Sequence, residues 1–283
     1  MTDIDFSARA GLGLGSRART PLVPANWSFP FGKAKGLVGL IVPALLLWTW
    51  HAASSRGLVA PQVLPAPAMV IETFLDLIDS GELAGNLWIS FQRVAYGFGI
   101  GASAGLLTGI AMGLSQRTER WLRPSFLLLG IIPVIGWLPL LMMLLGIGEA
   151  LKIVVIAKAA LLPVALHTMN GIASVPNTYR EVGRVYGFSP WQTLRRIVLP
   201  STILPIFTGL RIGLTTAWIS LVVVEMLAST EGVGYLLVWG RQLFQLDLMI
   251  AMMAVIGFIG FAMDKGLVLS EAALVKRFGG RSR

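Results

Sequence analysis

The stretch SFQRVAYGFGIGASAGLLTGIAMGLS, residues 90–115, decides the fold class of this chain. It exceeds the run of about 20 apolar residues that crosses the hydrocarbon core of a bilayer, and Arg93 is its only charged residue. Small residues at every fourth position let two helices approach closely, either within one subunit or between two subunits. Five glycines of the stretch have this spacing: Gly97, Gly101, Gly105, Gly109 and Gly113.

The composition of the whole chain indicates a membrane protein. Of its 283 residues, 55% are hydrophobic and only 13% are charged, and the mean hydropathy is +0.75, which is too apolar for a soluble domain. The absence of cysteine excludes disulfide bonds, a thiolate nucleophile and a cysteine metal site. The net charge of +9 could indicate nucleic acid, but the lysines and arginines fall in short segments between apolar runs. This distribution is typical of membrane topology, and we expect no nucleic acid partner.

Six apolar runs predict an all-α integral membrane protein with about six transmembrane helices. The arginines and lysines gather in alternate connecting segments, so the positive-inside rule predicts that both termini and the loop at 170–202 are cytoplasmic. The third run contains Pro133, Gly136 and Pro139, which predicts a kinked helix that either lines a pathway or is accommodated by its neighbours. The runs cover residues 36–52, 88–113, 124–145, 151–169, 203–227 and 247–270.

The segments outside the core differ in composition. Residues 1–35 are rich in arginine, glycine, serine and proline, which predicts a disordered cytoplasmic tail. Residues 36–87 hold the first span and an amphipathic helix at 67–83 on the outer side. Residues 88–275 form the core of the protein, and 276–283 form a basic cytoplasmic tail.

The outer helix carries a stripe of carboxylates at helical spacing, opposite an apolar face. Such a stripe is either a solvated surface or part of a docking face for an external partner. Its members are Glu72, Asp76, Asp79 and Glu82.

The loop between the fourth and fifth spans contains EVGRVYGFSPWQTLRRIVLP, residues 181–200, which predicts two short helices. Gly187 can adopt the left-handed conformation that ends the first helix. Ser189, Pro190 and Gln192 form a capping box that starts the second helix, which we expect to run to Leu199 before Pro200. Two capped helices are more structure than a topological anchor requires.

This loop resembles the EAA loop, E-A-A-x3-G-x9-I-x-L-P, of permease subunits of bacterial ABC importers. Val182 and Gly183 stand in place of the two alanines. The stretches LPAP (64–67), PLLMMLLGIGEALKI (139–153) and VEMLASTEGVGYLL (224–237), with residues 90–115, resemble the nitrate, sulfonate and taurine branch of these permeases. The motif positions that match are Glu181, Gly187, Ile197, Leu199 and Pro200.

The resemblance implies a homodimer in the bacterial cytoplasmic (inner) membrane, in contact with lipid. It implies a dimer of cytoplasmic ATP-binding-cassette ATPases that receive the loop at 170–202, and an external solute-binding protein. ATP and Mg would be bound by the partner ATPase, and no cofactor is expected in this subunit. Independently, the sequence contains no G-x-x-x-x-G-K-[ST] phosphate loop and no candidate catalytic cluster. His51 and His167 lie at the ends of different spans, so we expect no metal site.

Charges inside the spans are expensive unless they face protein or water, so they are candidates for the translocation path of a small, anionic solute. Snorkelling of the arginines to the interface is the alternative explanation. A secondary transporter driven by an ion gradient is the alternative function, but the inverted repeats typical of that class are absent from the sequence. The candidate path residues are Arg93, Pro133, Trp137, Lys158, Arg211 and Glu225.

Overall fold

The computed structural model describes residues 35–60 and 63–278, so the predicted tail at 1–35 lies, apart from Lys35, outside the described residues. The chain divides into two compact units, residues 1–49 and 50–283, and the packing described below is that of the second unit. The helices in chain order are α1 (Lys35–Ser55), α2 (Pro67–Asp79), α3 (Glu82–Leu114), α4 (Gln116–Ile131), α5 (Val134–Leu145), α6 (Glu149–Ala173), α7 (Asn177–Val185), α8 (Pro190–Thr193), η1 (Leu194–Val198), α9 (Leu199–Ser201), α10 (Ile203–Ala228), α11 (Val233–Gln242) and α12 (Leu246–Phe278).

The described residues form helices and connecting loops without a strand, which confirms the predicted all-α fold class. Among the residues that the structure describes, four helices are long and apolar enough to cross a membrane: α3, α6, α10 and α12. The pair α4 and α5 would make a fifth span if the two are counted together, although they are bent by 98° relative to each other. The first predicted span, 36–52, coincides with α1, which is 21 residues long.

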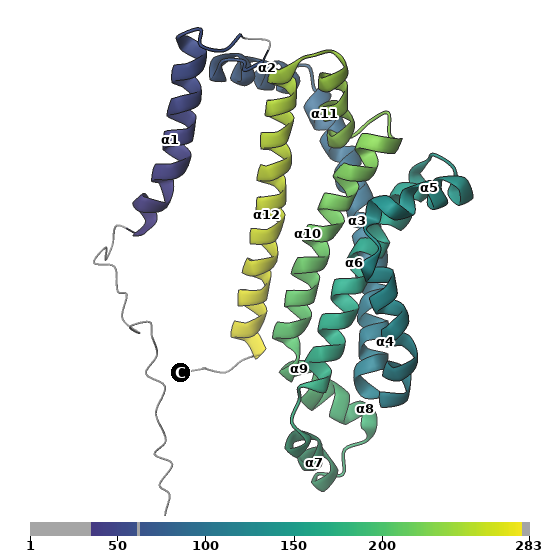
Figure 1. The fold of residues 1–283 in the computed structure, drawn as a ribbon. Helices are drawn as coiled ribbons and strands as arrows, with labels where there is room; N and C mark the ends of the chain where they lie inside the picture. Colours follow the sequence, from purple (N-terminus) through teal and green to yellow (C-terminus); the bar gives the residue numbers. More distant parts are fainter. Residues whose placement is uncertain (1–34, 61–62, 279–283) are drawn as a thin grey trace, which may run out of the picture. The chain divides into compact units, whose positions relative to one another are not determined.

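Helix α6 lies between α3 and α10 and packs closely against both (Figure 1). A Cβ atom added to Gly97 would lie 2.6 Å from the Ile156 side chain, and one added to Gly109 would lie 2.6 Å from the Ala165 carbonyl oxygen. All five glycines of the repeat meet α6 in this way, so the stripe is used for packing within the subunit. Gly213 of α10 also approaches α6 closely, since an added Cβ would lie 2.9 Å from Val164.

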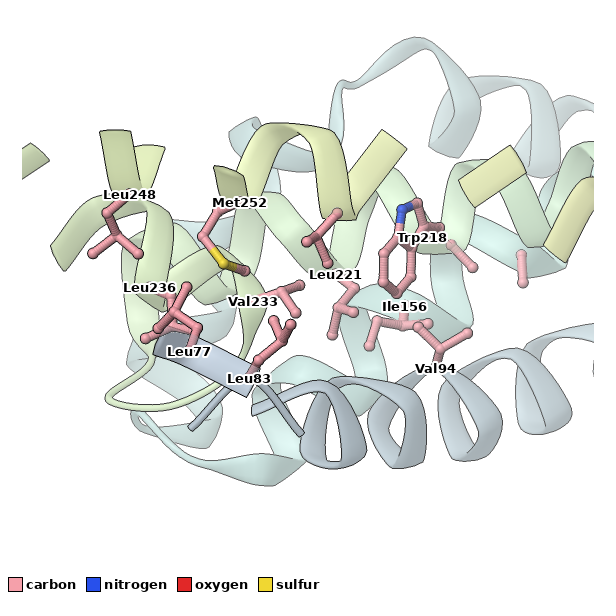
Figure 2. Close-up of a cluster of buried hydrophobic side chains, with 13 residues drawn as sticks. Leu77, Leu83, Val94, Ile156, Trp218, Leu221, Val233, Leu236, Leu248 and Met252 are labelled. Atoms are coloured by element: carbon pink, nitrogen blue, oxygen red, sulfur yellow. The ribbon is translucent and has the colours of Figure 1, made fainter. Parts of the chain in front are cut away.

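A hydrophobic core joins α2, α3, α6, α10, α11 and α12 near one end of the bundle. Figure 2 shows Leu77 of α2 beside Leu236 of α11, and Trp218 of α10 near Ile156 of α6. The Trp218 indole N–H donates to the Ile256 carbonyl oxygen of α12 at 3.2 Å, so the one polar atom of this ring is also satisfied. The short helices α2 and α11 thereby become part of the folded core.

The two ends of the bundle carry different short elements (Figure 1). Helices α2 and α11 lie at one end, which we call the α2–α11 end, and α7 and α8 lie at the opposite end, the α7–α8 end. Helix α5 turns away from the bundle axis after the bend. The N-terminus of α6 and the C-terminus of α10 are both at the α2–α11 end.

The structure differs from the prediction at the end of the outer helix and in one added helix. The outer helix ends at Asp79 and not at 83, because Gly81 adopts a φ of 75° and the chain starts α3 at Glu82. The predicted kink of the third span is confirmed, with its break at Ile132, whose backbone is extended before Pro133, whereas Pro139 remains inside α5. Helix α11 was not predicted.

Candidate functional sites in the bundle

A buried arginine connects three elements at the α2–α11 end. The Arg93 side chain on α3 is 2% exposed. Its Nε and Nη2 atoms donate to the two carboxylate oxygens of Glu149, at the start of α6, over 2.8 and 2.6 Å. Its Nη1 donates to Glu225 of α10 at 2.9 Å, and its Nη2 donates to Glu231 after α10 at 2.9 Å. We call these four residues the Arg93 cluster.

Glu225 has no exposed surface, and every contact it makes lies within the bundle. Its carboxylate accepts hydrogen bonds from the Ser90 hydroxyl at 2.8 Å and from the Gly234 backbone N–H at 3.0 Å. Ser90 in turn accepts the Val233 backbone N–H at 3.0 Å. The stretch around 229–234 thus folds over the buried Glu225 carboxylate. Hydrogen bonds from this stretch, Ser90 and Arg93 stabilise its charge, which would otherwise be very costly to bury.

Gly232 is required by this geometry. Its φ is +108°, and a Cβ atom added there would collide with the Glu225 carboxylate. Its backbone N–H donates to the Asn86 side chain at 2.6 Å. These contacts give a structural reason for the sequence E-G-V-G at 231–234, since both the close approach and the positive φ exclude a side chain.

The structure separates the candidate path residues into three places. Arg93 and Glu225 are in the cluster just described, and neither side chain lines the cavity of the next paragraph. Arg211 lies on α10 and pairs with Asp264 of α12, a partner that sequence reasoning did not identify. Both members of this second pair remain partly exposed on the described surface of the bundle.

Pro133, Trp137 and Lys158 come together at the bend between α4 and α5. A cavity of about 490 Å³ opens there, bounded by the bend, α6 and α10. The Lys158 Nζ donates to the Ile132 carbonyl oxygen at 3.3 Å and lies 4.8 Å from the centre of the Trp137 ring. The carbonyl is available to the lysine because α4 ends here and cannot use it in an α-helical hydrogen bond.

The predicted turn of the loop at 170–202 is present in the structure. Gly187 has a φ of +67°, and its N–H donates to the Arg184 carbonyl at 2.9 Å. The Ser189 hydroxyl accepts the Gln192 backbone N–H at 3.2 Å, and the Gln192 side chain accepts the Ser189 N–H at 2.9 Å. The predicted capping box is therefore formed.

The prediction that the second helix of this loop ends before Pro200 is wrong. The helix passes through the π-helical η1 and the short α9, which includes Pro200, and leads into α10. The wider π-helical turn precedes the residue that cannot donate a backbone hydrogen bond. Gly183 lies against this second part, since an added Cβ would be 3.2 Å from Ile197.

The other residues of the loop at 170–202 divide into an inner and an outer side. Leu194 and Val198 are buried against Ile172 at the end of α6, and Leu199 packs beside them. Glu181 and Val182 are exposed on α7. Further large side chains on the exposed side are Tyr179, Val185, Tyr186 and Trp191.

The acidic stripe is divided between two helices. Glu72, Asp76 and Asp79 are exposed on α2, and Glu82 is exposed in the first turn of α3. The apolar side of α2 is held by Val70 and Leu77, which are buried.

Comparisons with known proteins identify the class to which this fold belongs. Residues 101–278 match the family described as binding-protein-dependent transport system inner membrane component. The fold resembles the inward-facing MetNI methionine ABC transporter, with a TM-score of 0.59, 16% identity and coverage of 70% of this chain and 95% of that chain. The chain belongs to this family of permeases and is the membrane-spanning subunit of an ABC importer.

Relatives with higher identity are permeases named for particular solutes. SsuC of Bacillus subtilis, named for aliphatic sulfonates transport, is 39% identical over 84% of this chain and 86% of its own length. TauC of Escherichia coli, a taurine transport system permease, is 33% identical over 86% and 90%. NrtB of Synechocystis, a nitrate import permease, is 34% identical over 82% and 86%. These similarities support the importer over the secondary transporter.

Sequence reasoning missed Glu149 and Glu231 as partners of Arg93, and Ser90 as a partner of Glu225. Glu149 and Glu231 both fall within stretches that carried the family resemblance, 139–153 and 224–237, but they lie outside the apolar runs. A search for carboxylates at the ends of spans could have found them as possible partners of a charge inside a span. Which of them reaches Arg93 depends on how the helices pack.

Proposed function

We propose that this permease carries a small oxyanion, of the sulfonate or nitrate type, across the bacterial cytoplasmic membrane. The observation that carries the proposal is that the relatives covering more than four-fifths of the chain are named for aliphatic sulfonates, taurine and nitrate. Taurine is itself a sulfonate, so these solutes share a compact group in which several oxygens hold the negative charge. A lysine in a cavity midway along α6 is in keeping with such cargo.

The α7–α8 end is assigned to the cytoplasm. Arginines of α4 and of the loop at 170–202 gather at this end, and the last turns of α12 reach the same end. The positive-inside rule favours the cytoplasm for such a concentration of basic residues, and the predicted cytoplasmic location of both termini is part of the same proposal. The basic side chains on these described segments are Arg117, Arg120, Arg123, Arg184, Arg195, Arg196 and Lys276.

The exposed side of α7 and α8 is assigned to contact with the ATPase subunits. Val185 and Tyr186 are 85% and 73% exposed, and Trp191 is 65% exposed, although they lie beyond the membrane spans. Apolar and aromatic side chains at a protein surface of this kind mark a contact with another protein. The fixed turn at Gly187 sets the direction of α8 relative to α7, so the patch is presented as one unit.

The remaining partners are assigned to other surfaces. A second copy of the chain completes the translocation path, and it must contact a surface other than the glycine stripe of α3, which α6 already covers. An external binding protein docks at the α2–α11 end, where Asp76 and Asp79 are exposed. Exposed charges in such a contact act mainly on the rate of association.

Substitution of Gly187 tests the coupling function. In proteoliposomes containing the permease, its ATPase and its loaded binding protein, we expect Gly187→Val to reduce stimulated ATP hydrolysis and transport together. A β-branched residue at positive φ costs about 1 kcal/mol or more, so the turn relaxes and α8 is misplaced.

The matched control is Gly57→Val. Gly57 has the same φ of +67° and the same open surroundings, but it lies in the loop after α1. Glu181→Ala tests whether the exposed carboxylate contributes to the contact. If Gly187→Val and Glu181→Ala both insert, keep the ATPase bound and retain stimulated hydrolysis, the loop is only a topological anchor and the proposed coupling is wrong.

A further inference from the structure

The cavity at the bend between α4 and α5 contains a positive charge without a carboxylate partner. Arg93, Lys152 and Arg211 each form an ion pair within the bundle. Lys158 forms none with the described residues, and its Nζ contacts only a carbonyl oxygen and an aromatic face. Both contacts stabilise a cation, but neither neutralises it.

Lys158 also lies too far along its helix to reach the membrane surface easily. It is the tenth residue of α6, which begins at Glu149, so it lies about 14 Å from that end at 1.5 Å per residue. The walls of the cavity are otherwise almost entirely apolar. A cation in this position is costly unless it meets an anion or water. The other cations of the bundle named above pair with carboxylates, but no described carboxylate pairs with Lys158.

A second polar group faces the same cavity. Ser220 of α10 also lines this cavity and is only 4% exposed. Its hydroxyl makes no hydrogen bond with any described residue, whereas neighbouring Thr216 is bonded to carbonyl oxygens of its own helix. Because the Ser220 hydroxyl oxygen is not completely enclosed, it can donate to water or to a molecule bound in the cavity.

We propose that this cavity is a binding site for the oxyanion group of the transported solute, with the Lys158 ammonium as its counter-charge and the Ser220 hydroxyl as a hydrogen-bond donor. The inference rests on the proposed function, which supplies a small oxyanion as cargo. On this proposal, the bend between α4 and α5 contributes to the site in two ways. It frees the Ile132 carbonyl to hold Lys158 and removes a helical turn from the space that the anion occupies.

The site has the properties expected of a transient stop on a pathway. One cation and one hydroxyl give few contacts, and a volume of about 490 Å³ exceeds what nitrate or a short sulfonate fills. The remaining space would hold water or the tail of the solute. Binding that is weak enough to be released is what conduction requires.

The first experiment uses the permease alone. Because the chain contains no cysteine, Ser220→Cys introduces the only thiol, and its reaction with a small thiol reagent can be followed in proteoliposomes. We expect millimolar ethanesulfonate or nitrate to slow this reaction several-fold, and glycerol at equal concentration to have no effect. Ser103→Cys, on the exposed side of α3, should react at the same rate with and without the anion.

The same measurement in a Lys158→Gln background should show protection reduced about tenfold or more in apparent affinity, the usual range for a charge-assisted hydrogen bond. Lys158→Arg should retain it. Lys265→Gln removes an equal charge from the exposed surface of α12 and serves as the matched control. If the anions protect the Ser220→Cys thiol equally in the presence and absence of the Lys158 charge, or do not protect it at all, the proposed site is wrong.

Transport then separates this proposal from the function on which it rests. With the ATPase and loaded binding protein present, Lys158→Gln should lower uptake at least tenfold while stimulated hydrolysis persists. Unchanged uptake by Lys158→Gln would overturn the site and leave the importer function intact. Absence of stimulated hydrolysis in the wild type would contradict the importer function, and the protection experiment would still decide whether the cavity binds an oxyanion.

Discussion

Replacement of Arg93 by methionine should be among the most destabilising single changes in this protein. The substitution keeps an unbranched side chain in place but removes five hydrogen bonds to carboxylates and a carbonyl, with donor–acceptor distances of 2.6 to 2.9 Å. Glu149 and Glu231 are about half exposed and can be solvated after the loss. Glu225 has no exposed surface, so its charge would remain buried beside Ser90 and Gly234 alone.

The cost of leaving such a charge unpaired is about 3–5 kcal/mol. At roughly 2–4 °C per kcal/mol for a chain of this size, the midpoint of thermal unfolding should fall by about 10 °C. Unfolding of the purified permease in detergent, followed by size-exclusion chromatography of heated samples, measures this shift. The double variant Arg93→Met/Glu225→Gln should recover part of the loss, because the neutral amide no longer needs a counter-charge.

Arg211→Met is the matched control, since Arg211 also pairs with a carboxylate but is half exposed. Its thermal shift in detergent should be much smaller, because solvent can replace the partner. The reasoning fails if the two single variants unfold at similar temperatures, or if the double variant is no more stable than Arg93→Met.

Three further outcomes are expected. Gly101→Val should impair folding by overpacking the contact of α3 with α6, where an added Cβ would lie 2.9 Å from the Ala157 Cα. Gly99→Ala, on the open side of α3, should be neutral, and the yield of monodisperse protein measures both effects. Ser189→Ala should remove the capping box, cost about 1 kcal/mol and lower the thermal midpoint without affecting anion protection in the cavity. Cysteines at Ser174 and Thr230 should be labelled from opposite sides of the membrane by an impermeant reagent, and labelling of position 174 from outside would contradict the assigned orientation.

The membrane class, the approximate spans and the turn of the loop at 170–202 could be predicted from the sequence, because each depends on neighbours along the chain. A run of apolar residues must cross the bilayer as a helix whatever surrounds it, since its backbone polar groups can be satisfied only within the helix. Gly187, Ser189 and Gln192 determine the turn and the cap through contacts over a few residues. The predicted glycine face of α3 was also a local property.

Tertiary structure decided what those features contact. The sequence left the glycine stripe open between packing within a subunit and contact between subunits, and the position of α6 resolved it. Arg93, Lys158 and Arg211 had been grouped as charges within spans, yet one is enclosed by three carboxylates, one faces a cavity and one pairs with Asp264. Their hydrogen-bond partners lie between 26 and 138 positions away along the chain. The energy of a buried charge depends on which groups lie within a few ångströms of it, and only the packing of the helices determines that.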